Sequence, residues 1–137
     1  MTDDQSLPEG VAPHEGRELE LMLAGEKPLS MFGDAVGFAA EVPEADFAPY
    51  VADGILIRRE TVYTPPGRGL PGRFVYFARA GEEWRIDALH RINVRLFVNG
   101  ESTDPEIERE VGRLLGYADS DIERYLEWID AKRAGRT

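Results

Sequence analysis

The chain has 137 residues, 42% of them hydrophobic, which fits one ordinary domain with a real core and excludes wholesale disorder. Its formal net charge of −10 repels nucleic-acid phosphates and anionic membranes. The absence of cysteine excludes disulfides, thiolate nucleophiles and cysteine-ligated zinc, and no apolar run reaches the roughly 18–20 residues of a membrane span.

The N-terminal segment is predicted to be a flexible arm followed by a helix. Residues 1–14 hold two prolines and a glycine among few apolar groups, which is typical of a loose arm. Leu19, Met22 and Leu23 then fall at i, i+3 and i+4, so a helix is predicted over 15–24. The acidic start does not resemble a signal peptide, and we expect a cytoplasmic protein without a membrane segment.

The next two segments differ in how clearly they can be interpreted. Residues 29–40 are apolar but rich in small side chains, and their pattern leaves the structure open. The stretch PEADFAPYVADG predicts a short helix, because Pro43 suits a first turn and Phe47 and Val51 share one face. Gly54 is typical of the residue that ends a helix.

Two strands are predicted in the middle of the chain. Residues 55–63, ILIRRETVY, and residues 73–80, RFVYFARA, are dominated by β-branched and aromatic side chains without a breaker. The connection TPPGRGLPG is dense in proline and glycine, so the two strands are expected to form an antiparallel hairpin with a long tip.

Residues 82–97 fit two periods, and both interpretations stay open. Alternate positions from Trp84 to Leu96 are mostly apolar, which is the period of a strand. Acidic residues open the segment and arginines close it, as the dipole of a helix favours. We favour a helix over 82–95 that covers one face of the hairpin.

The C-terminal segment predicts two helices. The first has capping-box spacing at Thr103 and Glu106 and ends at Gly116, and the second has the same spacing at Ser120 and Glu123. Apolar residues recur at helical spacing in both, and the short connection predicts an antiparallel αα-hairpin.

Together these elements predict an α+β fold. A small antiparallel sheet formed by the hairpin 55–63/73–80 is covered by helices, with the αα-hairpin at the C-terminus. We expect the single domain to span 15–131, with a basic, frayed tail over 132–137.

Charge is distributed unevenly along the chain. Residues 1–54 have a net charge of −10, from twelve acidic and two basic residues, and residues 101–137 have a net charge of −4. Residues 55–100 have a net charge of +4 and contain eight arginines but no lysine. We favour the interpretation that acidic groups from the flanking segments neutralise these arginines from within.

The sequence offers no catalytic motif. No serine lies in a G-x-S-x-G elbow, the Pro/Gly loop joins two strands rather than a strand and a helix, and His14 lacks the second histidine of H-E-x-x-H. We therefore predict no catalytic residues, no metal and no cofactor. The helices after residue 100 carry too many acidic groups for direct DNA binding.

Three hypotheses about function remain. We favour a small acidic protein-binding module, an inhibitor or adaptor of a basic, nucleic-acid-processing protein, that docks through Glu18, Glu20, Asp46 and Asp53. The alternative is a small enzyme or ligand-binding protein for an anionic metabolite. Its site would use Arg58, Arg79, Arg85, Tyr76, Trp84 and His90. A homo-oligomer with Trp128 as the anchor of its interface is the third.

Overall fold

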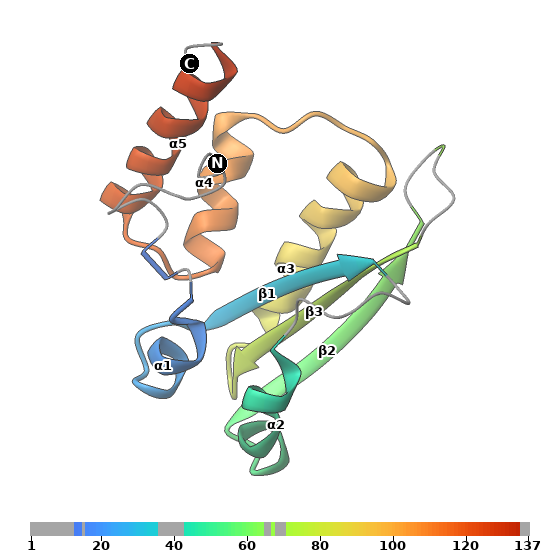
Figure 1. Cartoon of the computed structure of the whole chain (residues 1–137), viewed down its shortest axis with the longest axis vertical. Helices are drawn as coiled ribbons and strands as arrows, with labels where there is room; N and C mark the ends of the chain where they lie inside the picture. The colour runs from blue at the N-terminus through green and yellow to red at the C-terminus, as the bar shows by residue number, and fades with distance from the viewer. Residues whose placement is uncertain (1–12, 15, 36–42, 65–66, 68–70, 135–137) are drawn as a thin grey trace, which may run out of the picture.

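The computed structural model describes residues 13–14, 16–64, 67 and 71–134, except 36–42, and it confirms the predicted α+β fold (Figure 1). The elements in chain order are α1 (Glu18–Leu23), β1 (Leu29–Ala35), α2 (Glu44–Ala52), β2 (Leu56–Tyr63), β3 (Gly72–Arg79), α3 (Trp84–Asn93), the π-helical turn η2 (Val94–Val98), α4 (Pro105–Leu114) and α5 (Asp119–Arg133). Most of the expected N-terminal arm, most of the hairpin tip and the last three residues of the expected tail lie outside the described residues.

The sheet has three antiparallel strands in the order β1-β3-β2. The predicted hairpin is confirmed as β2 and β3, with Leu56 opposite Arg79 and Tyr63 opposite Gly72. The third strand comes from the segment whose pattern left the structure open, and it places Met31 opposite Tyr76. This strand gives β3 a neighbour on each side, and three strands are a far more stable unit than an isolated hairpin.

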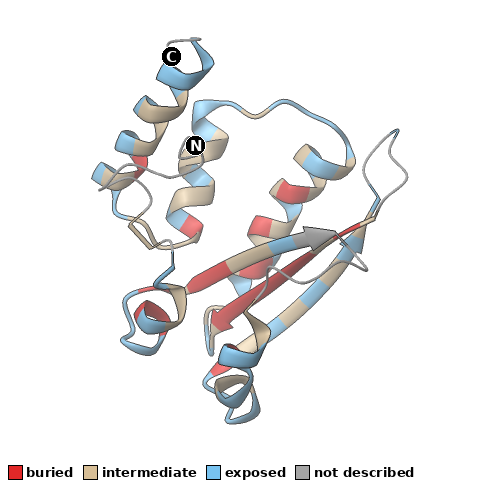
Figure 2. Cartoon of the chain, in the orientation of Figure 1, coloured by how far each residue is buried: buried red, intermediate tan, exposed pale blue. Residues whose placement is uncertain are grey.

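Helices cover both faces of the sheet, so β3 is buried on both sides (Figures 1 and 2). One core cluster packs α3 and α4 on one face; its buried residues are Leu29, Phe74, Tyr76, Ala78, Ile86, Leu89 and Leu114. The other packs α1 and α2 on the opposite face, with Met22, Phe47, Leu56, Val75 and Phe77. Burial of apolar surface on both faces is the main stabilising contribution to this arrangement.

The helical interpretation of residues 82–97 is confirmed. α3 buries Ile86, Leu89 and Asn93, three positions on one helical face, against the sheet. A strand would have left that face of the sheet exposed, and β1 already supplies the third strand. The helix continues into η2, a π-helical turn of a kind that is rare in proteins.

The αα-hairpin is confirmed, and two glycines set its geometry. Gly116 follows α4 with φ of +90°, and a Cβ there would lie 2.5 Å from Pro28 Cδ. A Cβ on Gly112 would lie 2.7 Å from Ile122 Cγ1, so this glycine allows α4 and α5 to approach closely.

Both predicted capping boxes are wrong. The side chain of Asp104, not Thr103, accepts the hydrogen bond from the backbone N–H of Ile107 at 2.9 Å and caps α4. The Thr103 hydroxyl instead donates to Glu108 at 2.8 Å.

The second box fails because α5 begins earlier than its spacing implies. The residue that precedes the helix is Ala118, so Ser120 lies inside the first turn. Glu123 is held away from the helix start by Arg109, whose Nε lies 2.8 Å from its Oε2.

Candidate functional site

The four predicted partner-binding carboxylates lie on two helices that cover the same face of the sheet. Glu18 and Glu20 are in α1, Asp46 is in the first turn of α2 and Asp53 follows its last residue. Met22 of α1 shares a core cluster with residues of α2, which fixes the two helices to one face. We call these four carboxylates the acidic face.

Only one member of the acidic face forms an ion pair with a described residue. Arg17 donates to Glu20 at 2.9 Å, and this hydrogen bond lowers the pKa of Glu20. Both side chains are exposed, so the pair contributes little to stability. Glu18, Asp46 and Asp53 make no side-chain hydrogen bond or ion pair within the described part of the chain.

Two arginines on this side of the sheet, Arg58 and Arg73, are held by two glutamates. Arg58 lies 2.8 Å from Glu44 and 2.6 Å from Glu60, and Arg73 lies 2.9 Å from the second oxygen of Glu44. Burial opposes ionisation of Glu44, but the hydrogen bonds from Arg58 and Arg73 outweigh it and lower its pKa. The positive charges of Arg58 and Arg73 are therefore neutralised within the protein by Glu44 and Glu60.

Other arginines of residues 55–100 are also paired. Arg59 lies 2.6 Å from Asp87, Arg85 lies 2.7 Å from Glu82, and Arg95 lies 3.0 Å from Glu101. Arg79 and Arg91 have no ion pair with a described residue, and Arg68 is not described. The neutralising acids thus come from the arginine-rich segment itself as well as from its flanks.

The structure does not bring the six predicted ligand-binding residues together. Because successive residues of a strand point to opposite faces, Arg58 and Arg79 lie on the α1–α2 side and Tyr76 lies on the α3 side. His90 contacts Tyr76 from α3. Trp84 and Arg85 open α3, where Trp84 is 56% exposed and the Arg85 guanidinium carbon lies 4.6 Å from its ring centre.

Tyr76 and His90 belong to a polar network between β3 and α3. The Tyr76 hydroxyl lies 3.1 Å from His90 Nδ1 and accepts a hydrogen bond from Asn93 Nδ2 at 2.9 Å. Asn93 Nδ2 also lies 3.0 Å from the sulfur of Met31. Burial raises the pKa of Tyr76 to about 12, so this hydroxyl stays protonated at neutral pH. The network satisfies buried polar groups and fixes α3 on the sheet.

Sequence reasoning missed a buried cation at the end of α4. Lys27 is 2% exposed; its Nζ donates to the Leu115 carbonyl at 2.6 Å and lies 2.9 Å from His14 Nδ1. The Tyr117 ring stacks on His14 at 3.9 Å and lies 4.8 Å below the ammonium group. No local pattern marks Lys27, because its partners lie far along the chain in both directions.

Trp128, the predicted anchor of an oligomer, is half-buried on α5. Its ring centre lies 6.0 Å from that of Tyr125, and Lys132 Nζ lies 5.3 Å from it. These contacts cover part of the indole within one chain.

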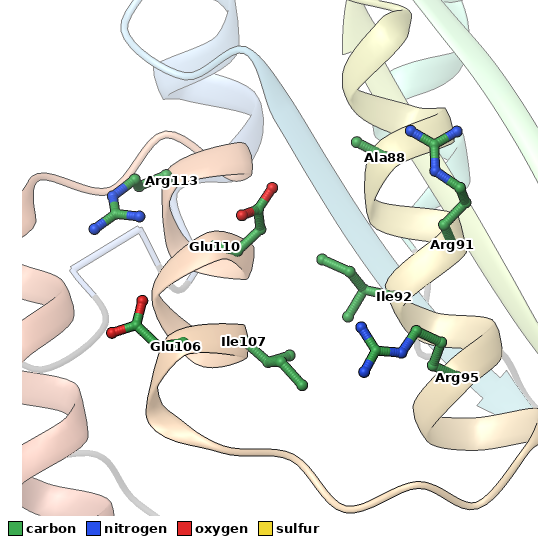
Figure 3. A pocket seen from close by; sticks show the side chains of 8 residues that line it. All are labelled: Ala88, Arg91, Ile92, Arg95, Glu106, Ile107, Glu110 and Arg113. Atoms are coloured by element: carbon green, nitrogen blue, oxygen red, sulfur yellow. The ribbon is translucent and has the colours of Figure 1, made fainter.

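The surface also carries a groove, and the described residues form no metal-binding cluster. A groove of about 480 Å³ lies between α3 and α4 and is lined by Ala88, Arg91, Ile92, Arg95, Glu106, Ile107, Glu110 and Arg113 (Figure 3). Among the described residues, no three His, Asp or Glu side chains come together where they could hold a metal ion.

No helix in the described ranges has both the length and the apolar character needed to cross a membrane. No protein-family model matches the chain, and no curated protein or solved structure is significantly similar to it.

Proposed function

We propose that the protein is a cytoplasmic, non-enzymatic binding module that docks through its acidic face on a basic surface of a partner protein, as an inhibitor or adaptor of a nucleic-acid-processing protein would. The observation that carries this proposal is the pairing pattern on one side of the sheet. Arg58 and Arg73 are already balanced by Glu44 and Glu60, whereas Asp46 and Asp53 have no cationic partner among the described residues.

The physical consequence is an outward negative potential above α1 and α2. Exposed charges of one sign steer a partner of opposite sign and raise its association rate, most strongly at low salt. Within this face, Asp53 stands at the C-terminal end of α2, where the helix dipole disfavours an anion. A carboxylate at this position lowers the stability of the helix, so its contribution to the negative surface supports a role in binding.

We rank a protein that acts on an anionic metabolite second. Such a site needs several cations and aromatic groups that converge on one cavity. Arg58 and Arg79 lie across the sheet from Tyr76, and five of the seven arginines that the structure describes between residues 55 and 100 are engaged in ion pairs.

The proposal is tested by affinity capture from native lysate with two matched variants. Asp46→Asn/Asp53→Asn removes two exposed carboxylates from α2, and Glu127→Gln/Asp130→Asn removes two exposed carboxylates from α5. Captured proteins, identified by mass spectrometry, are compared at about 0.05 M and about 0.5 M salt, because the higher concentration screens exposed charges.

We expect a basic protein that is captured by the wild type and by the α5 variant at low salt. It should be lost with the α2 variant and at high salt. Capture that is insensitive to salt and identical for both variants would refute docking through the acidic face.

A further inference from the structure

The groove between α3 and α4 has an apolar floor and charged walls. Figure 3 shows Ile92 of α3 and Ile107 of α4 pointing toward one another across it, with Ala88 beside them. Ile92 and Ala88 also pack on the core cluster beneath, so the floor is anchored to the sheet. The groove is therefore a firm apolar surface and not a gap between two mobile helices.

The α3 wall is basic, and the α4 wall combines Glu106 and Glu110 with Arg113. Arg91 and Arg95 line the α3 side, and the Arg95 guanidinium points toward α4 in Figure 3. On the α4 side, the Glu110 carboxylate points toward the groove. Arg91 and Glu110 make no ion pair with a described residue, although they line the same groove.

The basic wall extends along the π-helical turn. Arg91 lies in the last turn of α3, and Arg95 lies in η2, which continues the same helix. The π-helical turn is costly relative to regular helix, and such turns occur often at functional sites. Here it lies at the groove.

From these features we propose that the groove binds an amphipathic helical segment of a partner protein. Apolar side chains at i, i+3/i+4 and i+7 of that segment enter between Ile92 and Ile107. Carboxylates on its flank lie against Arg91, beside Arg95, which is paired with Glu101. The volume of about 480 Å³ suits a few anchoring side chains rather than a whole helix, which is the usual mode of helix-in-groove recognition. Arg91 has no ion pair with a described residue, and its charge selects an acidic flank on the side of the segment that faces α3.

This site is independent of the acidic face. It is formed by helices on the opposite side of the sheet from α1 and α2, and it selects a partner segment with carboxylates rather than a basic surface. A partner that carries both a basic surface and an acidic amphipathic helix would engage the two sites together.

The test uses two synthetic helical peptides of about 16 residues. Both carry leucines at i, i+3, i+4 and i+7; one has glutamates along one flank, and the other has glutamines at the same positions. Binding is measured by titration of the isotopically labelled full chain, followed through the backbone amide resonances. Two protein variants have the same change of charge: Arg91→Glu in the groove wall, and Arg124→Glu on α5, outside the residues that line the groove.

We expect the glutamate peptide to shift the amide resonances of Ala88, Ile92 and Ile107 and to leave α1 and α2 unchanged. Arg91→Glu should weaken binding of the glutamate peptide about tenfold and of the glutamine peptide less than about twofold. Arg124→Glu should leave both unchanged. Arg91 is exposed and forms no ion pair with any residue that the structure describes, so its replacement should preserve the fold, and thermal unfolding checks this.

Three results would overturn the proposal. They are the absence of saturable shifts at up to about 1 mM peptide, shifts that map outside the groove, and equal weakening by the Arg91 and Arg124 variants.

Discussion

Lys27 Nζ lies 2.6 Å from the carbonyl oxygen of Leu115, and this hydrogen bond joins the start of β1 to the end of α4 across 88 residues of sequence. Arg85 donates to the carbonyls of Arg113 and Leu114 at 3.2 and 3.1 Å. Two cations from separate segments thus satisfy the last carbonyls of α4, where the helix dipole favours positive charge. This end of the helix ties the αα-hairpin to the sheet.

Replacement of Lys27 by methionine should lower the free energy of unfolding by about 1–3 kcal/mol. The apolar stem is kept, but the Leu115 carbonyl loses its buried donor. Urea denaturation measures the change, and Lys132→Met, at an exposed position of α5, is the matched control. Equal stability of the two variants would show that this hydrogen bond contributes nothing net.

His14 should make stability depend on pH between about 6.5 and about 4. Burial, helped by the charge of Lys27, lowers its pKa from 6.5 to about 4. The unfolded chain therefore takes up a proton before the folded one does, and stability that is complete above pH 6.5 falls as the pH drops toward 4.

Urea denaturation at two pH values separates this effect from that of the carboxylates. From pH 7.5 to pH 5 the wild type should lose about 1 kcal/mol more than His14→Gln, after allowance for partial exposure of the ring. Carboxylates such as Glu44, whose pKa is lowered, reduce the free energy of unfolding only at lower pH, and they are present in both proteins. An identical loss in both would contradict a neutral His14.

Gly116→Ala should destabilise the fold more than Gly54→Ala. Both glycines have positive φ, +90° and +81°, so both alanines bear a backbone strain of about 1 kcal/mol. Only at Gly116 does the new Cβ meet a neighbour, Pro28 Cδ at 2.5 Å; at Gly54 nothing lies within 4 Å. We expect Gly116→Ala to cost at least about 2 kcal/mol in thermal unfolding. Equal effects would mean that the contact with Pro28 relaxes freely.

Asp104→Ala should cost about 1 kcal/mol, because it removes the side chain that caps α4. Thr103→Ala and Ser120→Ala, at the caps that sequence spacing predicts, should each change stability by less than about 0.5 kcal/mol. Chemical denaturation of the three variants ranks them, and a larger effect at Thr103 than at Asp104 would contradict the observed cap.

Asp53→Asn should raise the free energy of unfolding by about 0.3–1 kcal/mol, because it removes an anion from the negative end of α2. The same substitution should weaken capture of a basic partner. Asp46→Asn, in the first turn of the same helix, should weaken capture without this gain in stability. If Asp53→Asn is stabilising yet captures its partner as well as the wild type, Asp53 lies outside the docking surface.

The sequence by itself determined most of the elements, because their signals are local. Breakers bound β2 and β3, apolar residues recur at helical spacing in α4 and α5, and glycines end the helices. It also fixed the uneven distribution of charge along the chain. The caps of α4 and α5 were predicted wrongly because the same spacing fits several nearby polar residues.

Tertiary structure alone decided which of these residues meet. Segment 29–40 has no pattern of its own, and its first seven residues become β1 because β3 offers a free edge. Arg58 and Tyr76 lie on opposite faces of the sheet because of the strand register. Long-range packing placed Lys27 against Leu115 and Ile92 opposite Ile107. Such contacts depend on register and on helix packing, which are set by the whole core and not by neighbours in sequence.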